Sequence, residues 1–195
     1  MDAPISHRID AESDAALPCA IARWAAGSAP LAVAAVRDHA ALDRIAAALP
    51  SFAPDATILR LPAWDSLPYD RARPSRAVTG QRIGTLAWLA DATHADRRAI
   101  VVTTPEALLQ RVPPPSRVRE RAVPLAAGQP LDPTWLHDTL LGFGYAFDDR
   151  VDEPGEAAIR GGTVDVHLSG EGAPIRLELH EGRIAENRRY DPLTQ

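Results

Sequence analysis

The stretch Val151–Gln195, VDEPGEAAIRGGTVDVHLSGEGAPIRLELHEGRIAENRRYDPLTQ, decides the fold of the second half of the chain. Apolar and polar residues alternate through TVDVHL at 163–168 and again through IRLELH at 175–180, which is the period of half-buried strands. Turns between these runs are expected at glycines, namely at Gly170, Gly172 and Glu181-Gly182. The stretch therefore predicts a meander of antiparallel strands.

The polar side of this meander carries two arginines and a histidine. When Ile175, Leu177 and Leu179 face the core, Arg176 and His180 fall on the opposite face, two side-chain positions apart. Arg160 ends the strand before the glycine pair, which suits a bulge or a close approach of backbone. The simplest interpretation of the arginines is an ordinary surface pairing with Glu178 or Asp165, worth at most about 1 kcal/mol.

The first half of the chain alternates strand and helix patterns. Buried strands are predicted at 31–36, 57–61 and 99–102, and a helix capped by Asp38 at 38–49. This β-α-β order predicts a parallel sheet. A further helix is predicted at 79–89, with Ile83, Leu86 and Leu89 directed inward.

The proline triplet 113–115 predicts a domain boundary, which gives one domain at 1–115 and another at 116–195. In the second domain a strand is predicted near 122–126. Asp132 then caps a helix that has Pro133 in its first turn. The apolar stripe of this helix is predicted to contain Trp135, Leu136, Leu140 and Phe143.

Several kinds of chemistry are excluded by residue content. All 21 basic residues are arginine, so the chain has no G-x-x-x-x-G-K-[ST] nucleotide loop and no lysine for Schiff-base catalysis. The six histidines are scattered without metal-ligand spacing, and Cys19 is the only cysteine. We therefore expect no metal, no cofactor and no enzymatic activity in this chain.

Charge and hydropathy limit the classes of partner that the chain is expected to bind. Residues 1–115 hold 12 arginines and 12 acidic residues, whereas residues 116–195 hold nine arginines and 14 acidic residues, a net charge of −5. A surface that follows nucleic-acid phosphates needs the opposite sign, so nucleic acid is expected only as an indirect partner. No apolar run approaches the roughly 20 residues that span a bilayer, and residues 1–14 have no apolar signal core. A cytoplasmic location without membrane contact is predicted.

Four motifs in order carry a family resemblance: WDSLPYDRARPS at 64–75, TTPEALLQRVPP at 103–114, PGEAAIRGGTVDV with PIRLEL in the meander, and YDPLTQ at 190–195. Together they resemble the N-terminal UvrB-homology region of the bacterial transcription-repair coupling factors (Mfd). The resemblance implies an α/β fold with a degenerate helicase-like layer without a P-loop at 1–115. It also implies a UvrA-binding α+β module, similar to UvrB domain 2, at 116–195.

The resemblance also implies a function. Arg160 and Arg176 match the family's two UvrA-contacting arginines, and His180 stands where the family has a third contact, a phenylalanine. The chain is thus expected to recruit UvrA to stalled RNA polymerase, as a non-catalytic piece or a truncated homologue of an ATP-dependent DNA translocase. Two alternatives stay open at this point. The chain binds DNA directly, or its polar face binds the distal domain of its own parent protein and holds that protein inactive.

Overall fold

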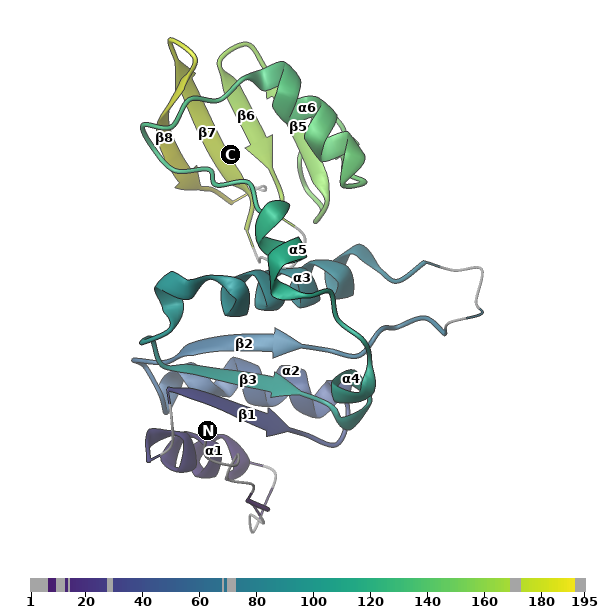
Figure 1. The fold of residues 1–195 in the computed structure, drawn as a ribbon, viewed down its shortest axis with the longest axis vertical. Coiled ribbons are helices and arrows are strands. Elements are labelled where there is room, and N and C mark those ends of the chain that lie inside the picture. The colour runs from purple at the N-terminus through teal and green to yellow at the C-terminus, as the bar shows by residue number, and fades with distance from the viewer. Residues whose placement is uncertain are drawn as a thin grey trace. The chain divides into compact units, whose positions relative to one another are not determined.

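The computed structural model describes residues 7–9, 13, 15–27, 30–67, 69, 73–168 and 173–191. Inter-residue contacts divide the chain into two compact units, Met1–Ala63 with Thr85–Ser116 and Trp64–Gly84 with Arg117–Gln195. The fold is mixed α/β, with one sheet of three strands and a separate sheet of five strands (Figure 1). The domain assignment 1–115 and 116–195 stays a prediction.

The three-stranded sheet is parallel and has the order β1-β3-β2, as the β-α-β order predicted. Its strands are β1 (Leu31–Ala35), β2 (Thr57–Leu61) and β3 (Ala99–Thr103). The helices and 3₁₀ turns associated with it are α1 (Leu17–Ala26), α2 (His39–Ala48), η1 (Leu49–Ser51), α3 (Arg76–Ala90), η2 (Ala92–His94) and α4 (Pro105–Leu109).

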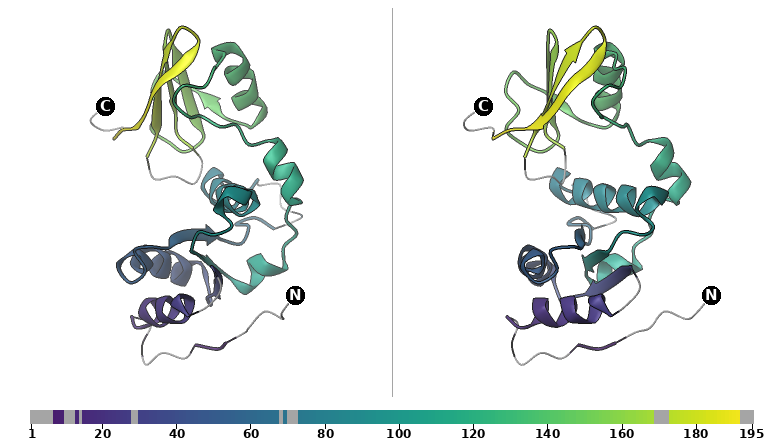
Figure 2. Two further views of the ribbon diagram at one scale, coloured as in Figure 1. Left: turned by 60° about the vertical axis from the view of Figure 1, so that its left-hand side comes forward. Right: turned by 90° about the vertical axis from the view of Figure 1, so that its left-hand side faces the viewer.

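Apolar side chains cover both faces of this sheet. On one face, Ala32, Ile100 and Val102 pack against α1 and α2, whose Ile21, Leu42 and Ile45 are buried with them (Figure 2). On the other face, Leu59, Leu61, Ala99 and Val101 pack against Leu86 and Trp88 of α3. Burial on both faces explains the near-continuous apolar sequence of β3, all five residues of which are buried. The prediction of a buried strand at 31–36 is only half right, because β1 lies at the edge of the sheet and its Leu31 and Val33 are 45% and 44% exposed.

Side chains cap the first turns of two helices of this unit, at Asp38 as predicted and at Thr104. The Asp38 carboxylate accepts a hydrogen bond from the backbone N–H of Ala41 at 2.7 Å, at the start of α2. Thr104 caps α4 in the same manner, through the N–H of Ala107. These contacts satisfy backbone donors that the first turn of a helix leaves without partners.

Two of the inward positions predicted for α3 are wrong. Ile83 and Leu89 are exposed, at 47% and 38% of their surfaces. Arg82 and Thr85 are buried instead, and the Thr85 hydroxyl donates a hydrogen bond to the backbone carbonyl of Arg60. Thr85 therefore shares the sheet-facing side of α3 with Leu86, at a position that apolar periodicity did not indicate.

The five-stranded sheet has the order β4-β5-β6-β7-β8 and contains the predicted antiparallel meander. Only the short pairing of β4 with β5 is parallel. The elements of this half are α5 (Pro115–Glu120), α6 (Pro133–Gly142), β4 (Ala146–Phe147), β5 (Glu156–Arg160), β6 (Thr163–Val166), β7 (Ile175–His180) and β8 (Arg183–Arg189). The turns predicted at Gly170 and Gly172 lie outside the described residues.

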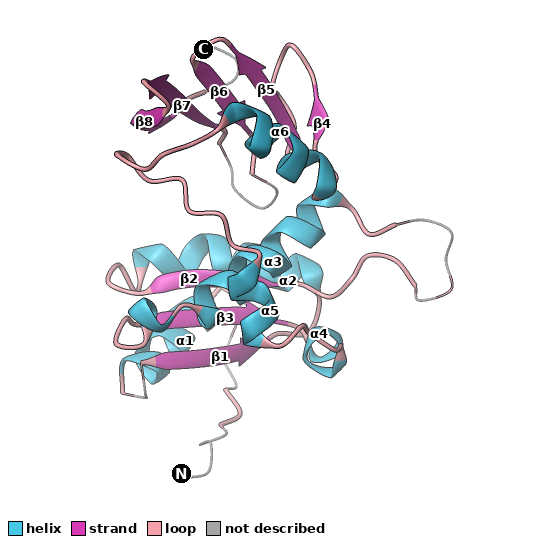
Figure 3. Ribbon diagram, turned by 45° about the horizontal axis from the view of Figure 1, so that its top comes forward, coloured by secondary structure: helices cyan, strands magenta, loops and turns pink. Residues whose placement is uncertain are grey.

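Helix α6 covers one face of the five-stranded sheet (Figure 3). Its N-cap is Asp132, as predicted, whose carboxylate accepts from the N–H of Thr134 at 2.9 Å. Leu136 and Leu140 are buried against the sheet, together with Val164, Val166, Leu177 and Ile184. Trp135 and Phe143, which were predicted to share this stripe, are about half exposed. The buried stripe is therefore narrower than the sequence suggested.

The strand predicted near 122–126 is wrong, because this segment has no regular secondary structure. Pro124 and Pro130 cannot donate backbone hydrogen bonds to a ladder. Pairing with β8 begins only at Gly128, whose N–H donates to Ile184 at 2.7 Å, and it ends where Leu131 donates to Gly182 at 2.9 Å. Residues 128–131 thus form only a short, irregular pairing with the edge strand β8.

Candidate partner-binding face

The face of the five-stranded sheet opposite α6 is formed by the polar positions of the meander. In register, Asp165 of β6 lies between Ala158 of β5 and Arg176 of β7. Arg160 ends β5 opposite Thr163, which places it diagonal to Asp165 on the same face. Strand alternation alone therefore brings both predicted arginines beside one carboxylate.

Asp165 is the centre of this face. Arg176 donates two hydrogen bonds to it, Nε to Oδ1 at 2.7 Å and Nη2 to Oδ2 at 2.8 Å. Arg160 donates from Nη2 to Oδ2 at 3.4 Å. The side chain of Asp165 is only 2% exposed, whereas those of Arg176 and Arg160 are 19% and 52% exposed. A buried carboxylate is thus neutralised by two cations of unequal burial.

Tyr190, just after β8, completes the cluster. The Arg176 guanidinium lies over its ring, 4.6 Å from the centroid, a geometry that is typical of cation–π contact. Hydrogen bonding to Asp165 raises the pKa of Arg176, against the opposing effect of burial. Burial raises the pKa of Tyr190 as well, and the negative charge of Asp165 adds to that rise. Both shifts favour a charged Arg176 and a neutral Tyr190 phenol beside the Asp165 side chain.

The glycine pair after Arg160 shapes the edge of this face. Gly161 has a φ of 57°, which a residue with a side chain rarely adopts. Gly162 accepts a hydrogen bond from the N–H of Leu179 at 2.6 Å, and a Cβ at Gly162 would lie 3.0 Å from the carbonyl oxygen of Leu179. The predicted close approach of backbone is confirmed, and it ties the β5–β6 turn to β7.

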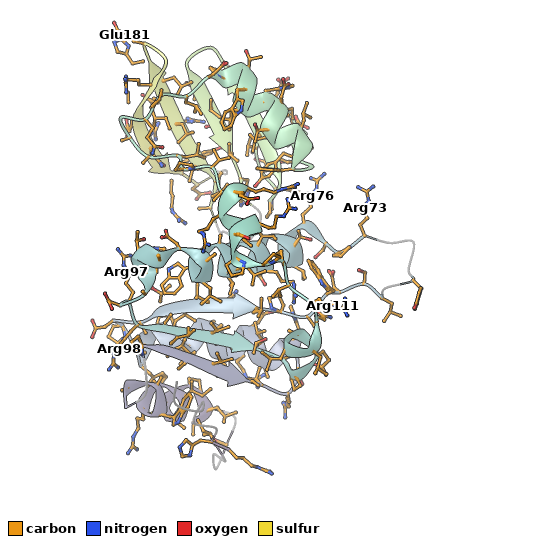
Figure 4. All side chains as sticks on the ribbon, viewed as in Figure 1. Arg73, Arg76, Arg97, Arg98, Arg111 and Glu181 are labelled. Carbon is orange, nitrogen blue, oxygen red and sulfur yellow. The ribbon has the colours of Figure 1, made fainter. Side chains whose placement is uncertain are left out.

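His180 lies on the same face but away from the arginine cluster. It is exposed and stands opposite Arg183, at the end of β7 next to the Glu181-Gly182 turn. Figure 4 shows Glu181 at the tip of this hairpin. His180 follows Arg176 by four positions, roughly 13 Å along a strand. The structure thus brings together Arg160 and Arg176, but not His180.

Two residues of this half were not found by sequence reasoning. Tyr190 was quoted only as part of a family motif, and no local pattern indicates its contact with Arg176. His167 is buried with 5% of its surface exposed, and neither ring nitrogen has a hydrogen-bond partner among the described residues. Strand alternation placed His167 on the polar face, so its burial had no signal in the sequence.

Within the described ranges, no group of three or more histidine, cysteine, aspartate or glutamate side chains could hold a metal ion. No helix in the part of the chain that the structure describes is both long enough and apolar enough to cross a bilayer.

Comparisons with known proteins agree with the sequence resemblance. The family model of the UvrB interaction domain matches residues 123–195, which include the Asp165 cluster. The transcription-repair-coupling factor of Myxococcus xanthus is 35% identical over 175 residues, which is 86% of this chain and 14% of that protein. That of Escherichia coli K12 is 31% identical over 137 residues, which is 70% of this chain and 12% of that protein.

The chain therefore spans about one seventh or less of these relatives. The transcription-repair-coupling factor of Mycobacterium bovis is 31% identical over 156 residues and is matched over a similar share, 78% of this chain and 12% of that protein. Over the part that it spans, the chain belongs to the transcription-repair-coupling factor family.

Proposed function

We propose that this chain is a non-catalytic recruitment module that binds UvrA and brings nucleotide excision repair to stalled RNA polymerase. Its parent protein would be an ATP-dependent DNA translocase that works in the cytoplasm. The observation that carries the proposal is the Asp165 cluster. The two arginines that resemble the family's UvrA contacts share one carboxylate on one face, within the residues that match the UvrB interaction domain.

The chemistry of this face suits a protein partner with acidic groups. Arg160 is half exposed and presents a planar guanidinium, which binds carboxylates through paired N–H donors. Arginine is also among the residues enriched at the energetic centres of interfaces. Glu178 and Glu186, exposed on the same sheet face next to Arg188, lower its net positive charge and make a nucleic-acid backbone a poorer fit.

The first unit has a supporting role in this proposal. Its parallel sheet is similar in pattern to a helicase half, and we propose that it is a degenerate helicase-like layer at 1–115, similar to the first domain of UvrB. The proposed UvrA-binding module at 116–195 is similar to UvrB domain 2. No lysine exists to reach the phosphates of a nucleotide, so this layer would act without ATP bound in a P-loop.

The test is calorimetric titration of the 195-residue chain with UvrA of the same organism. We expect a saturable signal for the parent chain and clear weakening with Arg160→Ala and Arg176→Ala. Arg117→Ala is the matched control, because it removes an arginine that is 71% exposed on α5, outside the face. Equal effects of all three substitutions would argue against a specific face, and absence of parent binding would refute the proposal.

The same chain separates the two alternatives. Titration with duplex DNA at rising salt would show a falling affinity if the chain bound phosphates directly. Titration with the distal domain of the parent protein, added as a separate polypeptide, would show binding that depends on Arg160 and Arg176 if the face were autoinhibitory. We expect no salt-dependent DNA affinity.

A further inference from the structure

Arg160 and Arg176 are not equivalent, although both bind Asp165. Arg176 binds both carboxylate oxygens, at 2.7 and 2.8 Å, and its guanidinium lies over the ring of Tyr190. Arg160 makes one longer bond of 3.4 Å and is 52% exposed, compared with 19% for Arg176. Arg176 is thus held by two hydrogen bonds and a ring contact, whereas Arg160 is held by one longer, charge-assisted hydrogen bond and keeps more of its surface open.

This difference in bonding decides which N–H groups of each arginine can bind a carboxylate of a partner. Bidentate capture of a carboxylate needs two adjacent N–H groups on one edge of the guanidinium plane. In Arg176 the Nε–Nη2 edge is already occupied by Asp165, and one face of the plane is covered by Tyr190. Arg176 keeps only its Nη1–Nη2 edge, on a side chain that is 19% exposed. Arg160 uses a single Nη2–H for Asp165 and has no other hydrogen-bond partner among the described residues, so one edge with two adjacent N–H groups stays open on a side chain that is 52% exposed.

The surroundings of Arg160 indicate where a partner group would enter. Arg160 lines a hollow of about 360 Å³ together with Phe147, Asp148, Asp149, Ala158 and Ile159. Strand β4 pairs only with Glu156 and Ala157, so the end of β5 that carries Arg160 extends beyond this pairing. The carboxylates of Asp148 and Asp149 repel a multiply charged phosphate more strongly than a singly charged carboxylate, so the carboxylate of a protein partner fits this hollow better.

We propose that Arg160 is the direct anion contact of this face and that Asp165, fixed by Arg176 and Tyr190, is a positioning residue. Asp165 holds the Arg160 guanidinium at the hollow by one of its N–H groups. A partner carboxylate then binds a side chain that is already oriented, which reduces the entropy lost on binding. This inference rests on the proposed function. It adds that the two arginines differ in role, because Arg160 contacts the partner and Arg176 fixes Asp165.

The test combines Asp165→Asn and Arg160→Ala in one cycle, measured by calorimetry with UvrA of the same organism. We expect Asp165→Asn to weaken binding roughly tenfold, within the range of couplings between contacting residues. In the Arg160→Ala background, Asp165→Asn should change the affinity by less than about twofold, because the side chain that it positions is gone. A merely structural role of Asp165 would weaken binding in both backgrounds alike.

The matched control is Asp138→Asn on α6, which removes the same charge from the opposite face of the sheet, where the carboxylate is 75% exposed. It should bind like the parent chain. If Asp165→Asn does not fold, Arg176→Lys replaces it, because lysine keeps the charge but cannot bind both oxygens of Asp165. The same lack of additivity with Arg160→Ala is then expected.

The arginine Nε–H signals in NMR spectra test the positioning without UvrA. Arg176 should give an Nε–H signal that is protected from exchange, and this protection should be lost in Asp165→Asn. Parent-like binding by Asp165→Asn, or full additivity with Arg160→Ala, would overturn the inference and leave the proposed function intact. Failure of the parent chain to bind UvrA would overturn both.

Discussion

Arg176 and Asp165 face each other directly across strands β7 and β6 and are joined by two hydrogen bonds of 2.7 and 2.8 Å. The pair lies on the sheet face opposite α6, where exposed charges are common, yet the Asp165 side chain is only 2% exposed. A bidentate pair in such a place stabilises the fold only as long as both partners are present.

Asp165→Asn should therefore destabilise the chain by about 2 kcal/mol, somewhat less than the cost of breaking a fully buried pair, because Arg176 keeps some contact with water. Urea denaturation followed by circular dichroism measures this loss. Glu186→Gln is the control, since Glu186 is 55% exposed and lies 3.6 Å from Arg188. Its cost should stay below about 0.5 kcal/mol. Equal costs would mean that Asp165 is as solvated as Glu186.

The raised pKa of Tyr190 predicts that the free energy of unfolding falls at alkaline pH. Its pKa is raised above the ordinary value of 10.0 by burial first and by Asp165 second. As pH rises, the unfolded chain therefore releases the phenol proton before the folded chain does. The contribution of the neutral phenol is fully present below pH 10 and is lost as pH rises through the folded pKa.

Tyrosinate absorbance during a pH titration measures this effect. One of the three tyrosines should ionise late in the folded chain, and the late phase should disappear in Tyr190→Phe and in urea. A late phase that persists in Tyr190→Phe would assign it to another residue.

Gly162 predicts a steric requirement at the β5–β6 turn. A Cβ added there would lie 3.0 Å from the carbonyl oxygen of Leu179, and the N–H of Leu179 is itself bonded to Gly162. The β5–β6 turn cannot move away from β7 without weakening that hydrogen bond. Gly162→Ala should therefore lower the free energy of unfolding by about 1–2 kcal/mol. Gly142→Ala, at the end of α6, meets nothing within 4 Å. It should be neutral or stabilise by up to about 1 kcal/mol, and thermal denaturation of the two variants compares them directly.

Local patterns predicted much of this fold. Alternation identified β6 and β7, apolar runs identified the parallel strands, and Asp38 and Asp132 identified two helix starts, because each of these signals depends on neighbours in sequence. The errors arose where nonlocal packing decides. Thr85 is buried in α3 through a hydrogen bond to β2, which no periodicity within the helix reports.

The candidate site was predictable to a similar degree. Alternation placed Arg176 and Asp165 on one face, and the resemblance selected Arg160 and Arg176. Their unequal geometry was not predictable, because it depends on strand register and on Tyr190, which approaches from beyond the end of β8. Burial of His167 escaped prediction for the same reason.

His167 predicts a substitution that stabilises the chain. The residue follows β6, its surface is 5% exposed, and neither ring nitrogen has a hydrogen-bond partner among the described residues. A buried polar group without a partner costs about 1–3 kcal/mol relative to an apolar group of the same shape. Phenylalanine keeps a flat ring of similar size, so His167→Phe should raise the free energy of unfolding by about 1 kcal/mol, measured by urea denaturation.

His39→Phe is the control, because His39 lies on the exposed start of α2 with a side chain that is 54% exposed. It should give no gain. A loss of stability in His167→Phe would mean that the ring nitrogens of His167 are hydrogen-bonded in solution.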